Sequence, residues 1–183
     1  RLVGGAEPRR AASELFADSL LAGDFAGAGR PAGPLAMVDI GSGAGFPGLV
    51  LKIVHPEREL VAIESSAKKC AFLKTVQREL RLEQTRIERA RAEALAENPA
   101  FAQKFDLVFC RAVAPPQEAL RLTVPFLRPG GSFILQAGPL TKEERNDLAA
   151  IADAMGVTIM DTKAYRLSIP PGERLLLRVT IVS

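Results

Sequence analysis

The sequence has no tryptophan, one tyrosine, one histidine and two cysteines. Cys70 and Cys110 provide neither a disulfide framework nor a metal-ligand spacing, and a single His55 excludes a histidine-rich metal site, so we expect no metal. Without tryptophan and with one tyrosine, a surface on which nucleic-acid bases stack is not expected. No stretch reaches the roughly 18 apolar residues of a membrane span, and no positive-then-apolar signal segment opens the chain. We therefore expect a cytoplasmic protein without a membrane partner.

The composition is that of one compact domain. The chain has 183 residues, of which 48% are hydrophobic, and this is enough to bury a sizeable core. The net charge is only +3, but residues 52–91 carry ten lysines or arginines against six glutamates. Such a basic stretch can guide a protein toward phosphates, or it can be an ordinary solvated helix surface with mixed charges. We expect a monomer.

Strand and helix patterns alternate five times along the chain. Apolar runs predict strands at 35–40, 59–64, 85–90, 105–112 and 130–136. Helices are predicted at 49–55, from Ser65 or Ser66 to about residue 80, at 94–102, 117–127 and 141–155. The last two predicted strands, 157–165 and 173–183, have no helix between them. This order predicts an α/β fold with a mostly parallel, seven-stranded, Rossmann-like sheet and a terminal antiparallel hairpin.

The N-terminal residues 1–34 do not share this alternation of strand and helix patterns. Residues 1–21 are predicted to be partly helical, and the Gly/Ala/Pro-rich stretch 22–34 is predicted to be a loop. We therefore divide the chain into an N-terminal lead-in and linker, 1–34, and a main domain, 35–183.

A glycine-rich loop follows the first predicted strand, where ligands bind in such sheets. Gly43, Gly45 and Gly48 fit the G-x-G-x-x-G fingerprint of dinucleotide-binding proteins, which is weak on its own. Asp39 to Gly45 also fits D-x-G-x-G-x-G, the first motif of class I methyltransferases that use S-adenosylmethionine. A pyrophosphate favours helix N–H groups without a nearby negative charge, whereas the ammonium and sulfonium of S-adenosylmethionine suit a carboxylate at Asp39. Alternatively, Asp39 only ties the loop backbone together.

Other segments favour the methyltransferase interpretation. Glu64 ends the second predicted strand, where an acid can accept both ribose hydroxyls of either cofactor. Arg91–Glu93 end the third strand, where methyltransferases bracket the adenine, and the L-x-P-G-G turn at 127–131 precedes their fifth strand. A nicotinamide-dependent oxidoreductase would need a Tyr-Lys or His-acid arrangement, and the single tyrosine and histidine lie outside plausible positions. Cys110 ends the fourth strand and is expected to be a small buried residue.

Five segments together resemble one family. They are DIGSGAGFPGLVLKIVHP, ESSAKKCAFLKTV, RAE, FDLVFCRAVAP and LRPGGSFILQAGP, and they are similar to the glucose-inhibited division protein B family over roughly residues 10–180. The resemblance implies the class I methyltransferase fold, S-adenosylmethionine as cofactor, and methylation of guanine N7 in 16S ribosomal RNA of the small ribosomal subunit. It also implies that Gly41, Phe46, Ser65, Ala92, Glu93 and Arg111 line the cofactor site. Guanine N7 carries a free lone pair, so its methylation needs no general base.

The predicted site residues form two sets. The cofactor set is Asp39, Gly41, Gly43, Gly45, Phe46, Glu64, Ser65, Ser66, Ala92, Glu93 and Arg111. The RNA-binding set is Lys68, Lys69, Lys74 and Arg174. Arg111 is the one candidate for positioning either the acceptor or the cofactor, unless it forms a structural ion pair with a neighbour such as Glu93.

Three positions depart from the family's usual pattern. Leu15 stands where a histidine usually precedes the Asp-Ser pair, Gln136 replaces a lysine in the fifth strand, and Leu175 replaces a histidine after Arg174. Two alternatives therefore stay open beside the active enzyme. One is a dinucleotide-dependent oxidoreductase, and the other is a cofactor-binding module with weakened catalysis.

Overall fold

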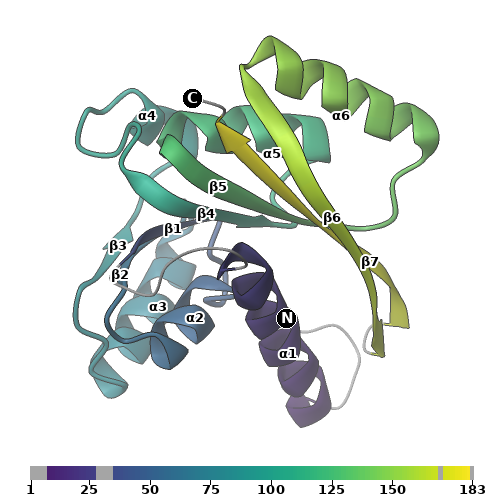
Figure 1. The fold of residues 1–183 in the computed structure, drawn as a ribbon. Coiled ribbons are helices and arrows are strands. Elements are labelled where there is room, and N and C mark those ends of the chain that lie inside the picture. The colour runs from purple at the N-terminus through teal and green to yellow at the C-terminus, as the bar shows by residue number, and fades with distance from the viewer. Residues whose placement is uncertain (1–7, 28–34, 169–170, 182–183) are drawn as a thin grey trace.

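The computed structural model describes residues 8–27, 35–168 and 171–181. They form one twisted seven-stranded sheet between two layers of helices, as Figure 1 shows. The strands are β1 (Ala36–Ile40), β2 (Glu59–Ile63), β3 (Thr85–Glu88), β4 (Phe105–Arg111), β5 (Leu127–Ala137), β6 (Val157–Ser168) and β7 (Pro171–Ile181). The helices are α1 (Pro8–Gly27), α2 (Gly48–Val54), α3 (Ala67–Glu79), α4 (Ala92–Ala96), α5 (Pro116–Thr123) with a 3-10 turn at Val124–Phe126, and α6 (Lys142–Ala154).

The strand order confirms the predicted topology. It runs β3-β2-β1-β4-β5-β7-β6, with β1 to β5 parallel and β7 antiparallel to both β5 and β6. The order reverses between β1 and β4, and this switch point is where ligands bind in open α/β sheets. The glycine loop after β1 and the segment after β4 meet there.

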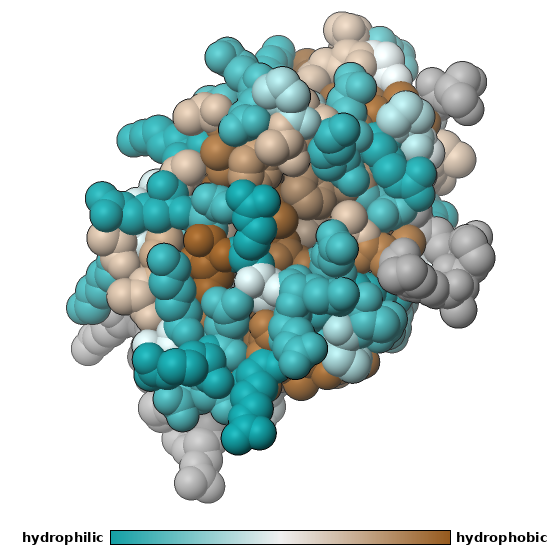
Figure 2. Space-filling model, turned by 90° about the vertical axis from the view of Figure 1, so that its left-hand side faces the viewer, coloured by the Kyte–Doolittle hydropathy of each residue, from teal (hydrophilic) through white to brown (hydrophobic). Residues whose placement is uncertain are grey.

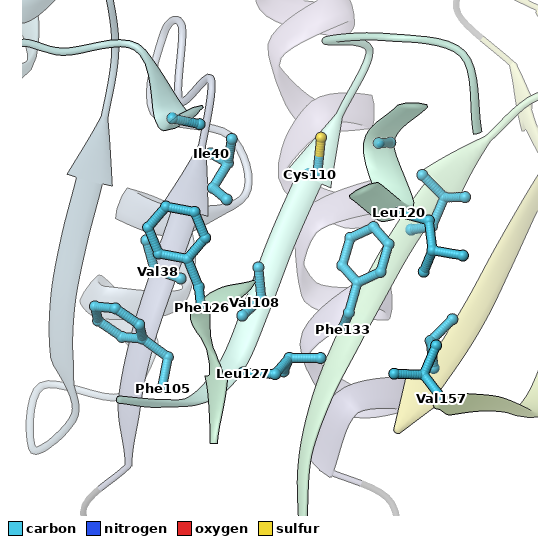
Figure 3. Close-up of a cluster of buried hydrophobic side chains, with 14 of the residues drawn as sticks. Val38, Ile40, Phe105, Val108, Cys110, Leu120, Phe126, Leu127, Phe133 and Val157 are labelled. Atoms are coloured by element: carbon cyan, nitrogen blue, oxygen red, sulfur yellow. The ribbon is translucent and has the colours of Figure 1, made fainter. Parts of the chain in front are cut away.

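Each face of the sheet has its own apolar cluster. On one face, α4, α5 and α6 pack against apolar side chains of the sheet. Figure 3 shows Val38, Val108 and Phe133 of three strands on this face. On the other face, α1, α2 and α3 cover a second cluster. Cys110 is buried in the first cluster, as predicted, and its burial raises the pKa of the thiol to about 12. It is thus a packing residue rather than a nucleophile.

Helix α1 corrects one prediction. Residues 22–27, which we expected to be part of a loop, continue the helix to Gly27. Phe25 and Ala26 are buried in the second cluster. The Leu51 side chain of α2 packs closely against Gly23, at a place that a Cβ atom would otherwise occupy. Packing of this face outweighs the low helix propensity of glycine. The rest of the predicted linker, 28–34, lies outside the described residues, and the division of the chain at residue 34 stays a prediction.

Several other boundaries differ from the prediction: β5 begins three residues earlier, at Leu127, β6 continues three residues further, to Ser168, and α4 is displaced. Helix α4 begins at Ala92 and ends at Ala96, whereas the pattern predicted 94–102. Ala92 is buried, which anchors the earlier start, and the Asn98 side chain accepts a hydrogen bond from the Ala100 N–H in the turn that follows.

In the part of the chain that is described, no helix is long and apolar enough to cross a membrane.

Candidate cofactor and acceptor site

The glycine loop is held by backbone hydrogen bonds to the neighbouring strand. The N–H groups of Gly41 and Ser42 donate to the carbonyl of Ile63, at 2.9 and 3.1 Å. Gly43 has a positive φ of 57°, which glycine adopts without strain, and a Cβ there would meet only a backbone oxygen at 3.7 Å. The loop therefore exposes bare backbone at the carboxyl end of β1.

Glu64 lies directly beside this bare backbone. Its carboxylate accepts hydrogen bonds from the N–H of Gly43 at 3.0 Å and of Ser66 at 2.8 Å, and the residue is buried. The Lys69 ammonium lies 3.7 Å from the same carboxylate, and the Ser66 hydroxyl caps α3. Backbone N–H groups thus fix the orientation of the carboxylate at the end of β2, and its contact with the hydroxyl groups of a ribose stays a prediction.

A narrow crevice joins several of the predicted cofactor residues. It has a volume of about 120 Å³ and runs from the glycine loop to the start of α4. From the predicted set, it is lined by Gly41, Glu64, Ser65, Ala92 and Glu93. Val113, which follows β4, lies over Gly41 and narrows the crevice. The structure therefore brings together predicted residues from three separate segments of the chain, and Val113, which was not predicted, adds a fourth segment.

Asp39 lies beneath the loop rather than in the crevice. It is buried, and its carboxylate accepts a hydrogen bond from the N–H of Gly48 at 3.0 Å. Burial raises its pKa from 3.8 to about 6, although the hydrogen bonds and the charge of Arg111 act in the opposite direction. This geometry is the loop-tying role that the sequence left open, and a direct contact with a cofactor cation stays a prediction.

A larger cleft opens beyond the end of β4. Its volume is about 520 Å³, and its lining includes Asp18, Arg111, Gln136, Tyr165 and Arg174. No histidine, cysteine or lysine is among the described residues that line the cleft or the crevice. Burial first, and the hydrogen bond to Asp18 next, raise the pKa of Tyr165 above its ordinary value. Two carboxylates line the cleft, and both already accept hydrogen bonds from the protein: Asp18 from Arg111, and Glu144 from the Thr141 N–H.

Arg111 sits where the cleft approaches the glycine loop. Its guanidinium lies over the Phe46 ring, with Cζ 5.7 Å from the ring centroid. Its Nη1 donates to the Asp18 carboxylate at 3.0 Å. The ion pair that we considered with Glu93 is therefore wrong, because the partner is Asp18, which lies 93 residues away in sequence. Asp18 and Tyr165 were not among the predicted site residues, and only the Asp-Ser pair gave a sequence signal for the former.

Most of the remaining predicted residues lie outside both hollows. Gly45 and Phe46 line a third, apolar groove of about 310 Å³ between α1, α2 and α3. Lys68, Lys69 and Lys74 are exposed on α3. Arg174 alone of the RNA-binding set lines the acceptor cleft. Among the described residues, no group of three or more His, Cys, Asp or Glu side chains is placed to hold a metal ion.

Comparison with known proteins identifies close relatives. Residues 1–166 match the family model described as GidB, rRNA small subunit methyltransferase G. The ribosomal RNA small subunit methyltransferase G of Carboxydothermus hydrogenoformans is 42% identical over 142 residues, which are 78% of this chain and 60% of that protein. The namesake from Deinococcus deserti is 34% identical over 164 residues, covering 90% of this chain and 66% of that protein. The chain thus spans about 60% of the length of several of these relatives.

Solved structures share the fold at low sequence identity. M. jannaschii TYW2 in complex with AdoMet superimposes with a TM-score of 0.70 at 14% identity, over 92% of this chain and 77% of that one. Geranyl diphosphate C-methyltransferase from Streptomyces coelicolor gives 0.70 at 15% identity, over 95% and 80%. These likenesses confirm the predicted class I methyltransferase fold.

Proposed function

Because the chain belongs to the rRNA small subunit methyltransferase G family, we propose that it methylates guanine N7 in 16S ribosomal RNA with S-adenosylmethionine. The observation that carries this proposal is the pairing of the two hollows at one sheet edge. The crevice offers a ribose-accepting carboxylate, and the cleft beside it lacks a histidine, cysteine or lysine. An acceptor atom that needs no deprotonation fits such a cleft.

The residues of the crevice fit S-adenosylmethionine. The Glu64 carboxylate, fixed by the N–H groups of Gly43 and Ser66, is placed to accept the two ribose hydroxyls. Ala92 and Glu93, which line the crevice at the start of α4, are proposed to contact the adenine. Gly43, where no side chain blocks the approach, allows close contact with the loop. Gly45 and Phe46 shape the loop from its far side, against the apolar groove.

The chemistry needs positioning more than proton transfer. When bound, S-adenosylmethionine supplies an electrophilic methyl group on a sulfonium, and its sulfur leaves as a neutral thioether. Guanine N7 attacks with its free lone pair and keeps the new bond without losing a proton. The protein has to align the acceptor and exclude water, and alignment of this kind contributes several kcal/mol to catalysis. The Tyr165 hydroxyl, with its raised pKa, stays protonated and donates to Asp18.

Arg111 is assigned to the acceptor rather than the cofactor. It lines the larger cleft but not the crevice that holds Glu64 and Glu93. Its side chain is one-quarter exposed, so donor groups remain accessible from the cleft. An arginine at this place can donate to guanine O6, which lies on the same edge of the base as N7.

The basic side chains of α3 are proposed to hold RNA phosphates. Figure 2, which looks onto the side of the molecule that carries β2, β3 and α3, shows hydrophilic side chains over most of that face. Lys68, Lys69 and Lys74 are exposed there. Lys68 and Lys69 begin a helix, where positive charge opposes the helix dipole. The Glu64 carboxylate, 3.7 Å from the Lys69 ammonium, offsets this for Lys69, so it is the unfavourable placement of Lys68 that supports a role in binding an anion.

Methyl transfer to the small subunit tests the proposal. The 183-residue chain is incubated with labelled S-adenosylmethionine and with small subunits, or naked 16S RNA, from cells that lack this modification. N7-methylguanosine is then mapped by reductive strand cleavage and primer extension. We expect one N7-methylated guanine, and a large but measurable fall in transfer, without loss of S-adenosylhomocysteine binding, in Arg111→Ala.

Two results would contradict the proposal in different ways. Tight binding of NAD with none of S-adenosylhomocysteine would restore the oxidoreductase alternative, which membership of a methyltransferase family opposes. Tight S-adenosylhomocysteine binding without transfer to either RNA would instead favour the weakened module. The departures at Leu15 and Gln136, both of which line the acceptor cleft, are the observation behind that second candidate.

A further inference from the structure

Asp18 gathers hydrogen bonds from three strands at the wall of the acceptor cleft. The residue belongs to α1 and is only 3% exposed. Its Oδ2 accepts from Arg111 Nη1 and from Gln136 Nε2, both at 3.0 Å, and its Oδ1 accepts from the Tyr165 hydroxyl. A buried carboxylate is tolerated when it is paired and hydrogen-bonded in this way. Asp18 is therefore engaged by the protein and not free to contact a ligand.

The guanidinium of Arg111 is held from a second direction by the glycine loop. It lies over Phe46, and Phe46 in turn makes an edge-on contact with Phe16 of α1, with ring centroids 5.5 Å apart. Helix α1 thus supplies both the carboxylate and the ring that supports Phe46. Gln136 and Tyr165 are uncharged donors, so Arg111 is the only cation within ion-pair distance of Asp18 among the described residues.

We propose that Asp18 is a positioning residue that fixes the Arg111 guanidinium, so that it donates to O6 of the target guanine and leaves the N7 lone pair free. This inference rests on the proposed function. Arginine commonly donates to O6 and N7 of guanine together. A lone pair that accepts such a hydrogen bond cannot attack the methyl group. A guanidinium free to swing would therefore bind the base in an unproductive way, and the fixed carboxylate prevents this.

The decisive test compares Asp18→Asn with a matched variant elsewhere. Asp106 is also a buried aspartate paired with an arginine, because it accepts from Arg128 Nε at 2.7 Å and from the Ala36 N–H at 2.9 Å. It lies at the opposite end of β4 from Arg111. Both variants are assayed for methyl transfer to small subunits and for S-adenosylhomocysteine affinity by calorimetry.

We expect Asp18→Asn to lower kcat by about tenfold to a hundredfold, since misplacement of this size removes the alignment on which the step relies. KM for the RNA should change by less than about threefold, because the freed guanidinium still binds the base but in the wrong geometry. Cofactor affinity should stay within about twofold. Asp106→Asn should leave all three unchanged. An Asp18→Asn protein with wild-type kcat would overturn the inference.

A double-variant cycle shows whether Asp18 acts through Arg111. In an Arg111→Ala background, Asp18→Asn should cause no further loss of kcat, because the group that it positions is already absent. A further loss of about tenfold would show an independent role and overturn the inference. If Asp18→Asn does not fold, Asp18→Glu keeps the charge but displaces the guanidinium. That variant should then show the fall in kcat with normal cofactor affinity, and wild-type kcat in it would count against the inference.

Tyr165 gives a readout that does not depend on activity. It is the only tyrosine, and the chain has no tryptophan, so phenolate absorbance during a pH titration reports on this site alone. Burial, the hydrogen bond to Asp18 and its charge raise the pKa of Tyr165 above 10, while Gln136 and Arg174 act in the opposite direction. Asp18→Asn should lower the pKa of Tyr165. An unchanged pKa would show that Tyr165 and Asp18 are not in contact, and this would overturn the inference.

Failure of the proposed function would look different. If the wild-type protein binds S-adenosylhomocysteine but methylates no guanine N7, the proposed function falls, and this inference falls with it. If the wild type is active and Asp18→Asn matches it, only the inference falls.

Discussion

The protonation of Asp39 beneath the glycine loop should make the stability of the protein depend on pH in a specific direction. Desolvation raises the pKa of this buried carboxyl from 3.8 to about 6. The folded protein then holds the proton more tightly than the unfolded chain does. The favourable contribution of this group is complete below about pH 4 and is lost as the pH rises through about 6. At about 1.4 kcal/mol per pKa unit, the change is about 3 kcal/mol.

Asp39→Asn isolates this contribution, because the amide oxygen can still accept from the Gly48 N–H but the side chain no longer titrates. Urea unfolding of the wild type and the variant is measured at several values between about pH 4 and pH 7. The free energy of unfolding of the wild type, relative to the variant, should fall by about 2 kcal/mol across this range, because the unfolded carboxyl is already partly ionised at pH 4. Other titrating groups cancel in the difference.

A difference that stays flat with pH would refute the reasoning, since it would mean that the pKa of the carboxyl is the same in the folded protein as in the unfolded chain. A difference that rises with pH would refute it more strongly, because the loop would then favour the charged form. Titration of the wild type and of Asp39→Asn with S-adenosylhomocysteine distinguishes two roles of Asp39. One is to hold the loop backbone, and the other is to contact the cofactor ammonium directly. We expect the affinity to fall less than about threefold, as befits a side chain engaged by backbone.

Three further perturbations probe the loop and the basic helix. Gly48→Ala places a Cβ atom 2.6 Å from Asp39 Oδ2 and 2.8 Å from Asp39 Cβ. It should lower the free energy of unfolding, measured in urea, by about 1–3 kcal/mol, and wild-type stability would contradict this close packing. Gly43→Val strains a backbone with φ of 57° and should abolish cofactor binding in calorimetry while the domain still folds; unchanged affinity would show that the loop does not approach the ligand. The double variant Lys68→Gln, Lys69→Gln should reduce the slope of log RNA affinity against log salt concentration by up to about two. An unchanged slope would show that both lysines only form a solvated helix surface.

The sequence by itself determined the architecture and the cofactor loop. The alternation of strand and helix patterns predicted the parallel sheet and the terminal hairpin, and both are confirmed. Glu64 and the glycine loop could be found because strand ends and turn residues are local features, encoded by residues close in sequence. The same local reasoning was wrong at residues 22–27, where the burial of Phe25 and Ala26 against the sheet extends a helix through glycine-rich sequence.

The acceptor side was decided only by the tertiary structure. Asp18 meets Arg111, Gln136 and Tyr165 across 93, 118 and 147 residues of sequence. Such contacts depend on how α1 packs across the sheet, and that packing angle leaves no periodicity or motif in the chain. The partner of Arg111 was therefore beyond sequence reasoning, because a guanidinium at a strand end can pair with whichever carboxylate the folded helices bring to it.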